Sequence, residues 1–252
     1  MPQSDNDDCV REIFVALARA VANGKPIVRV SSTDKEFSFQ NWFAEILDDL
    51  GLQYDEPSRN AYPDFRLIDY PLGFEIKGLG LPGRVANYDC NSQVPSGNHR
   101  GRHIYYVFGR YPARPSSDRY PVLDLVCCHG DFLNADHTYE HENKNFRGFG
   151  SYGDLMVRDR KMYVAPTPYA LADGTEGQVT LIAGRGFLLG ASLSERGDLE
   201  RIETDQLIRG YCFDMVTHDL TPTFIDNPNA GKRHLFTALR LERLPGPIVV
   251  LR

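Results

Sequence analysis

The period of the hydrophobic pattern changes once along the chain, and this change most limits the folds open to it. Up to residue 50 the apolar side chains recur every three or four positions, which predicts helices over residues 5–22 and 39–50. From residue 64 onward they alternate or form short β-branched and aromatic runs, which predicts strands. Two helices followed by a series of strands are expected to form one mixed α/β (α+β) domain around a central sheet.

Local signals place the boundaries of these elements. Asn23-Gly24 ends the first helix, Ser38 is the expected N-cap of the second, and Gly51 is its expected end. Pro71-Leu72-Gly73 is typical of a hairpin turn. The expected strands are residues 26–30, 64–70, 73–79, 103–109, 122–128, 154–165, 178–184 and 234–243. No internal repeat or composition break divides the chain, so residues 1–252 are interpreted as a single domain.

Composition narrows the class of protein. Apolar residues make up 42% of the 252 residues, enough for a sizeable core, and no apolar run reaches the length of a membrane span. The acidic start MPQSDNDD argues against a secretory or transit signal. The five cysteines are odd in number, scattered and without a CxxC pair, which favours a reducing cytoplasm over a disulfide framework.

Charge is uneven along the chain. The net charge of −6 argues against a general nucleic-acid binder. Residues 84–119, however, contain six arginines and two histidines against only two aspartates. A local basic face on an acidic protein can bind a polyanion, so nucleic acid stays among the expected partners.

Residues 63–78, PDFRLIDYPLGFEIKG, hold the charges that most need an explanation. On a strand, Glu75 and Lys77 share one face while Phe74 and Ile76 share the other. A hairpin is expected to bring Asp64, at the start of the preceding strand, close to Lys77. Two carboxylates beside a lysine favour a Mg²⁺ site, because hard cations prefer oxygen ligands. The alternative is a cross-strand charge pair that only holds register.

Pro63-Asp64, ten intervening residues and then Glu75-Ile76-Lys77 resemble the motif of the PD-(D/E)XK nuclease superfamily, and within it the type II restriction endonucleases. Two further features fit: Glu45 in the helix before the first of these strands, where that family often has another acidic residue, and an Asn/Ser/Pro loop at residues 88–99 before a hydrophobic strand. The close likeness covers residues 38–110. A solvated helix flank is the other interpretation of Glu45.

The resemblance implies a restriction-endonuclease-like core, a central mixed sheet flanked by helices, with the catalytic part at about residues 38–130. It implies that Asp64, Glu75 and the carbonyl of Ile76 bind Mg²⁺, that Lys77 positions the attacking water, and that Glu45 assists. The implied reaction cuts double-stranded DNA to leave a 5′-phosphate and a 3′-hydroxyl. It also implies a homodimer and a cognate DNA methyltransferase as genetic partner.

DNA-contacting residues are expected within residues 84–165. Amide side chains pair with adenine, arginines pair with guanine, and hydroxyls contact phosphates. The candidates are Asn91, Ser92, Gln93, His99, Arg100, Arg102, Arg158, Arg160, Lys161 and Arg84. For residues 91–93 an ordinary polar turn explains the pattern as well, and for 158–161 a solvated strand face does so.

Residues 127–143 offer a rival site. Cys127, Cys128, His129, His137 and His141 include zinc-binding residue types, although adjacent cysteines on a strand point to opposite faces. The segment is otherwise a polar loop. No GxxxxGK[ST] or GxSxG motif occurs. Besides restriction cleavage, three functions stay open: a structure-specific or repair nuclease, a non-catalytic DNA-binding protein, and a small-molecule enzyme built on residues 127–143.

Overall fold

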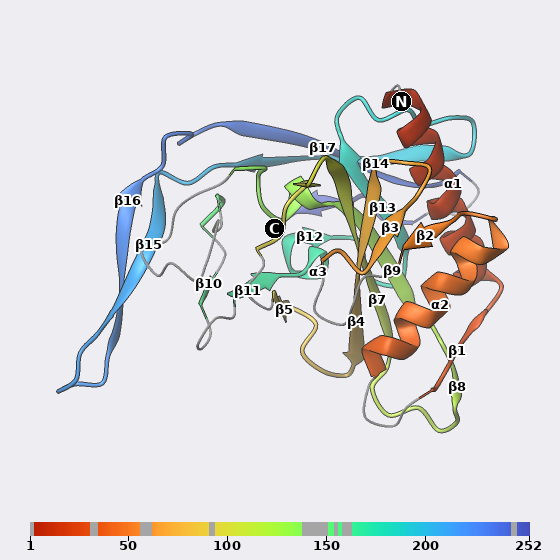
Figure 1. Ribbon diagram of the computed structural model, residues 1–252, viewed down its shortest axis with the longest axis horizontal. Helices are drawn as coiled ribbons and strands as arrows, with labels where there is room; N and C mark the ends of the chain where they lie inside the picture. The colour runs from red at the N-terminus through yellow and green to blue at the C-terminus, as the bar shows by residue number, and fades with distance from the viewer. Residues whose placement is uncertain are drawn as a thin grey trace.

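A computed structural model describes residues 3–30, 35–55, 62–90, 94–137, 151–153, 156–157, 163–242 and 246–252. Its centre is a mixed sheet (Figure 1). In spatial order the sheet runs β14 (Leu193–Ile202), β17 (Arg233–Leu241), β13 (Val179–Gly184), β9 (Asp124–His129), β7 (Arg102–Pro112), β4 (Leu72–Leu81), β3 (Phe65–Leu67) and β2 (Tyr54–Asp55), with β6 (Asn98–His99) paired to β7. The pairs β4–β7 and β9–β13 are parallel and the others antiparallel, so the predicted mixed α/β class with a central mixed sheet is confirmed.

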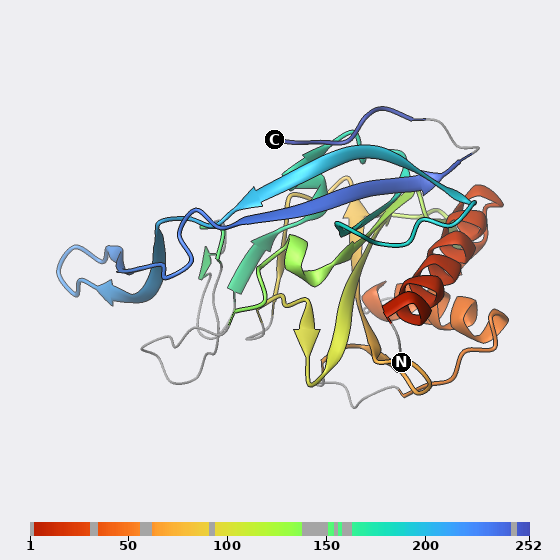
Figure 2. The same cartoon turned by 90° about the horizontal axis from the view of Figure 1, so that it is seen from above.

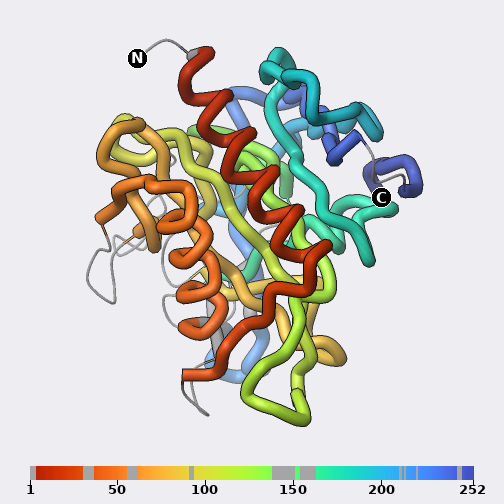
Figure 3. The backbone as a smooth tube through the Cα atoms, turned by 90° about the vertical axis from the view of Figure 1, so that its right-hand side faces the viewer, coloured from red at the N-terminus to blue at the C-terminus, as the bar shows by residue number. Residues whose placement is uncertain are grey.

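The two long helices cover one face of this sheet (Figure 3). They are α1 (Gln3–Ala22) and α2 (Lys35–Asp49), close to the predicted spans. Their apolar stripes are buried against the sheet, and the ring of Phe43 lies 5.2 Å from that of Phe65 and 5.4 Å from that of Phe74. Gly51, with a φ of +69°, follows α2 as predicted, because glycine adopts this backbone conformation without strain.

The N-cap prediction for Ser38 is wrong, since α2 begins at Lys35 and Ser38 is buried inside it. Its hydroxyl instead accepts a hydrogen bond from the Val30 N–H at 3.3 Å.

Short strands and turns, rather than long helices, cover the opposite face. A small sheet of β10 (Met156–Val157), β11 (Tyr163–Pro166) and β5 (Asn87–Asp89) lies there with α3 (Pro168–Leu171) and the 3₁₀ turn η1 (Gly130–Phe132). The aromatic residues of this second core are Tyr88, Tyr106, Phe108, Phe132, Tyr163, Tyr169 and Phe236. The finer likeness to a restriction-endonuclease core stays a prediction.

A hairpin of β15 (Gln206–Phe213) and β16 (Leu220–Asp226) projects from the body (Figures 1 and 2). It leaves the sheet after β14 and returns into β17. The remaining pairs are β1 (Pro26–Val28) with β8 (Arg119–Pro121), and β12 (Ala172–Asp173) with β18 (Val250–Leu251). Across the described stretches, no helix has both the length and the apolar composition needed to cross a bilayer.

Candidate functional site

The predicted acidic pair lies where the β3–β4 ladder ends. The register pairs Phe65 with Phe74, so Asp64 is across from Glu75 and Pro63 is across from Ile76. Proline has no N–H to donate, and β3 begins only after Pro63, at Phe65. The Asp64 carboxylate replaces a main-chain acceptor here, because its Oδ2 accepts a hydrogen bond from the Ile76 N–H at 2.8 Å. The end of the ladder therefore fixes this carboxylate at the edge of β4.

Glu75 and Lys77 complete the group on the same face of β4. The Glu75 Oε2 accepts the Asp64 main-chain N–H at 3.3 Å, and its Oε1 lies 2.9 Å from the Lys77 ammonium. Only 12% of the Glu75 side chain and 15% of the Lys77 side chain are exposed. The structure thus brings together the three charged residues predicted from the sequence. The Ile76 N–H holds the Asp64 carboxylate, and the Asp64 N–H holds the Glu75 carboxylate.

The main chain adds an oxygen to this group. In an extended strand the N–H and C=O of one residue leave the same edge. The Ile76 N–H points to Asp64, so the Ile76 carbonyl leaves β4 on the same side. Two carboxylates and a carbonyl are the oxygen types that Mg²⁺ prefers, and Mg²⁺ fills its other positions with water or phosphate oxygens. The residues present therefore fit the predicted ion.

Aromatic side chains that the sequence reasoning missed line this group. Tyr106 on β7 is the register partner of Glu75, and its hydroxyl lies 2.8 Å from that of Tyr62. Burial raises the pKa of Tyr62 above its ordinary value, and the nearby Glu75 charge adds to the rise. Burial also raises the pKa of the Cys90 thiol to about 12, so this thiol stays protonated. The charged residues thus lie next to neutral, partly apolar side chains. These lower the local dielectric constant and so strengthen the interactions between the charges.

The structure does not bring Glu45 to this group. Its carboxylate lies 3.4 Å from the Lys25 ammonium and is 54% exposed. Phe43 and Ile46 of the same helix pack on the Phe74 and Ile76 side of β4, whereas Glu75 and Lys77 face the other way. The prediction that Glu45 assists catalysis is corrected to a surface ion pair on the helix-covered face.

His99 and Arg100 lie near the group. The His99 ring meets the Tyr62 ring edge to face at 4.9 Å. Burial lowers the pKa of His99, and the charges of Arg100 and Arg66 lower it further. His99 is therefore neutral at pH 7 beside two guanidinium groups, one of which, Arg66, the sequence reasoning did not single out. Arg100 is exposed, and its position suits contact with a phosphate.

Two of the predicted DNA-contacting arginines, Arg102 and Arg84, form contacts within the protein. The Arg102 guanidinium donates to the carbonyls of Leu67, Tyr70 and Leu72 at 2.7–3.4 Å, which holds the β3–β4 turn. Arg84 lies 2.9 Å from Asp89 and is 46% exposed, so it can still reach an anion. The contact predicted for Arg102 is corrected to a structural role.

Arg110, in the same basic segment, is buried against Asp124 in a two-pronged ion pair that joins β7 to β9. The basic segment is therefore only partly a basic face. The candidates Asn91, Ser92, Gln93, Arg158, Arg160 and Lys161 lie outside the described residues.

The rival cysteine site does not form. Cys127 and Cys128 are both buried on β9 and belong to the two opposite cores, as the alternation of a strand requires. His141 lies outside the described residues. His137 instead meets Glu203 and His234, two residues that were not candidates. Comparison of the chain with models of known families, with characterised proteins and with solved structures finds no match.

Proposed function

We propose that the protein is a Mg²⁺-dependent endonuclease that hydrolyses phosphodiesters of double-stranded DNA. The observation that carries this proposal is the convergence of Asp64, Glu75 and Lys77 at the end of the β3–β4 ladder. A sheet-edge arrangement of two acids and an amine has no need of main-chain anchoring if it serves only as a surface ion pair. Here both acids accept main-chain N–H groups and are held in place before any ligand arrives.

Each residue has a role that follows from its position. Asp64, Glu75 and the Ile76 carbonyl would hold the ion, which when bound supplies charge neutralisation at the phosphorus and a more acidic water. Lys77, 2.9 Å from Glu75, presents N–H donors next to the space where an attacking water would lie. Tyr62 and Tyr106 exclude bulk water from one side of the group. Arg100 and Arg84 are placed to hold the DNA backbone.

A restriction endonuclease is the favoured form of this activity, with a 5′-phosphate and a 3′-hydroxyl as products and a homodimer as the working unit. A symmetric duplex site is cut in both strands most simply by a two-fold dimer. A structure-specific or repair nuclease would use the same group on other DNA. A non-catalytic DNA-binding protein would use Lys77 and Glu75 only as a register pair.

One digestion separates these functions. Unmethylated plasmid DNA is incubated with the wild-type protein in Mg²⁺ or in EDTA, and with Asp64→Asn in Mg²⁺. Restriction cleavage predicts discrete fragments with wild type in Mg²⁺ alone. A smear, or cutting only of branched or damaged DNA, supports the repair nuclease. The complete absence of cutting under all conditions, with DNA retained in a gel-shift assay, overturns the catalytic proposal.

A further inference from the structure

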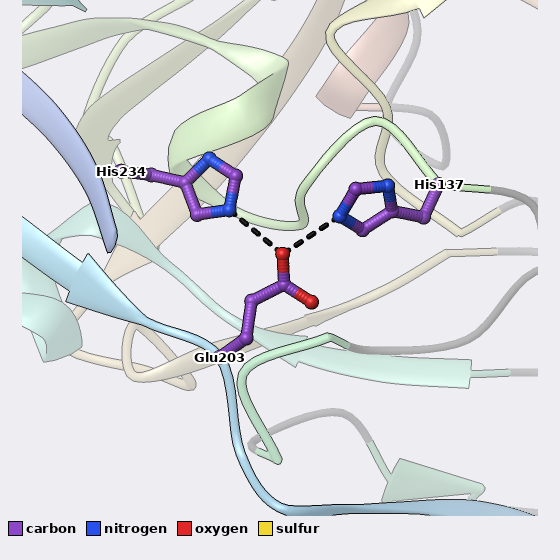
Figure 4. A group of neighbouring side chains, drawn as sticks. All are labelled: His137, Glu203 and His234. Carbon is purple, nitrogen blue, oxygen red and sulfur yellow. Dashed lines mark hydrogen bonds and ion pairs between the residues drawn. The ribbon is translucent and has the colours of Figure 1, made fainter. Parts of the chain in front are cut away.

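Two histidines and a buried glutamate meet near the β14–β17 edge of the central sheet (Figure 4). The Oε1 of Glu203 lies 2.7 Å from the Nε2 of His137 and 2.8 Å from the Nε2 of His234. His137 follows η1, Glu203 follows β14 directly, and His234 lies near the start of β17. All three ligand-type atoms are within 4.8 Å of one another.

Glu203 is built into this position. Its side chain has no exposed surface, and its second oxygen accepts the Asn227 amide at 3.1 Å. Burial alone would raise the pKa of this carboxyl, but the hydrogen bonds from His234, His137 and Asn227 outweigh burial, and the pKa is lowered. The group is therefore a buried carboxylate, oriented by an amide on one oxygen and by two imidazoles on the other.

We propose that His137, Glu203 and His234 bind a divalent cation of the zinc class. Two imidazole nitrogens with one carboxylate oxygen suit Zn²⁺, whereas Mg²⁺ takes oxygen ligands almost exclusively. Bond lengths of about 2.0–2.1 Å in tetrahedral geometry require ligand atoms ~3.3 Å apart. The nitrogens now stand at hydrogen-bonding distance from the oxygen, so a small opening admits the ion in place of the shared protons. Water would complete the coordination of a three-ligand site.

The ion would fasten the root of the projecting β15–β16 hairpin. Asn227 directly follows β16, and its amide also donates to the Thr204 carbonyl at 2.9 Å. Glu203 begins the same root, while His137 comes from the segment after β9. One ion would thus join the body of the domain to both ends of the hairpin. A two-stranded hairpin alone is marginally stable in water, so a cross-link at its root sets how firmly it is held.

This site is separate from the proposed nuclease site. His234 and Glu203 belong to the β14–β17 edge of the sheet, and β13, β9 and β7 lie between that edge and β4. A failure of zinc binding therefore leaves the nuclease proposal untouched, and a failure of DNA cleavage leaves the zinc proposal untouched.

The test is a Co²⁺ titration of the 252-residue protein after treatment with EDTA. We expect visible ligand-field absorbance that saturates at one equivalent and disappears when Zn²⁺ is added. His234→Ala and, separately, Glu203→Gln should each weaken Co²⁺ binding at least 100-fold. His103→Ala, which changes a histidine on β7 outside the cluster, should leave the titration unchanged.

A second readout keeps the test sharp if a variant folds poorly. Equimolar Zn²⁺ should raise the Tm of the wild-type protein and slow proteolysis within residues 206–226. Absence of Co²⁺ absorbance in the wild type overturns the proposal and identifies the cluster as hydrogen-bonded only. Full Co²⁺ affinity in folded His234→Ala also overturns it, because the ion would then be bound elsewhere.

Discussion

Replacing Asp64 by asparagine separates the chemistry of the acidic pair from its structural role. The Asp64 Oδ2 accepts the Ile76 N–H at 2.8 Å, and an asparagine carbonyl can accept the same hydrogen bond. The substitution weakens that bond because it loses charge assistance, but it also removes a negative charge next to Glu75. These effects have opposite signs, so we expect the free energy of unfolding without Mg²⁺ to change by about 1 kcal/mol or less.

Asp64→Ala differs from Asp64→Asn because alanine has no oxygen to accept the Ile76 N–H. It leaves the partly buried Ile76 N–H without this acceptor, which costs about 1–3 kcal/mol. Both variants lose the metal ligand. Loss of about 4 kcal/mol of charge stabilisation in the transition state lowers the cleavage rate about 10³-fold. The expected pattern is thus equal loss of activity with unequal loss of stability.

The stabilisation of the folded protein by bound Mg²⁺ can also be estimated. At ten times its Kd, an ion that binds only the folded state adds RT ln 11, or about 1.4 kcal/mol. For a domain of this size that raises Tm by about 3–5 °C. We expect this rise in the wild type, measured by differential scanning fluorimetry with Mg²⁺ against EDTA, and less than about 1 °C in Asp64→Asn. An equal Mg²⁺ shift in both proteins, or undiminished cleavage by Asp64→Asn, would refute the assignment of this carboxylate as a ligand.

Three further outcomes follow from buried charges elsewhere. Arg110→Met strands the Asp124 carboxylate in the core and should cost about 3–5 kcal/mol in urea unfolding; a loss under 1 kcal/mol contradicts the buried pair. Arg102→Met frees three main-chain carbonyls and should cost about 1–3 kcal/mol with unchanged DNA affinity of the folded protein in a gel shift. Burial lowers the pKa of His129 to about 4 and raises the pKa of Asp131 to about 6. Between pH 4 and pH 6 the two residues together bind one proton in either state, on Asp131 when folded and on His129 when unfolded. The free energy of unfolding therefore does not change with pH in this range. In His129→Gln only the raised pKa of Asp131 remains, so the free energy of unfolding should fall by about 3 kcal/mol as the pH rises from 4 to 6. A free energy of unfolding that stays constant over this range in the variant disproves the compensation.

The local pattern was sufficient for the two long helices and for five strands of the central sheet. Both helices and the strands at β4, β7, β9, β13 and β17 lie within a few residues of their predicted spans, because each buries a clear apolar face. The strands β14, β15 and β16 were not predicted. The β14 pairing has a bulge between Glu195 and Gly197, and the β15–β16 pairing has one between Ile208 and Gly210. A bulge shifts the alternation by one residue, so the period of two is broken inside the strand.

Sequence distance explains which site could be predicted. Asp64 and Glu75 are joined by one hairpin, and the hairpin signal predicted Asp64 near Lys77 on the second strand. The turn predicted at Pro71-Leu72-Gly73 is wrong by a few residues, because Leu72 and Gly73 already belong to β4, and the observed register sets Asp64 across from Glu75. His137 and Glu203 are 66 residues apart, and Glu203 follows a strand that the pattern did not reveal. The assignment of Glu45 failed for another reason: helical periodicity gives the angle of a side chain around the helix but not the face of the sheet on which the helix packs.

Both candidate ion sites arise at the end of a strand pairing, and this has a physical cause. Within a ladder every main-chain N–H and C=O is used, so a side chain there can only point up or down. Where pairing stops, a carboxylate can bond to the groups that the ladder releases, as Asp64 does with the Ile76 N–H. Glu203, just past β14, is held by a side chain instead, the amide of Asn227 after β16. Such a carboxylate is already oriented before an ion binds. Less side-chain entropy is therefore lost on cation binding. The same reasoning implies that shifting the register of β3 by one residue, rather than removing any charge, would abolish ion binding at the acidic pair.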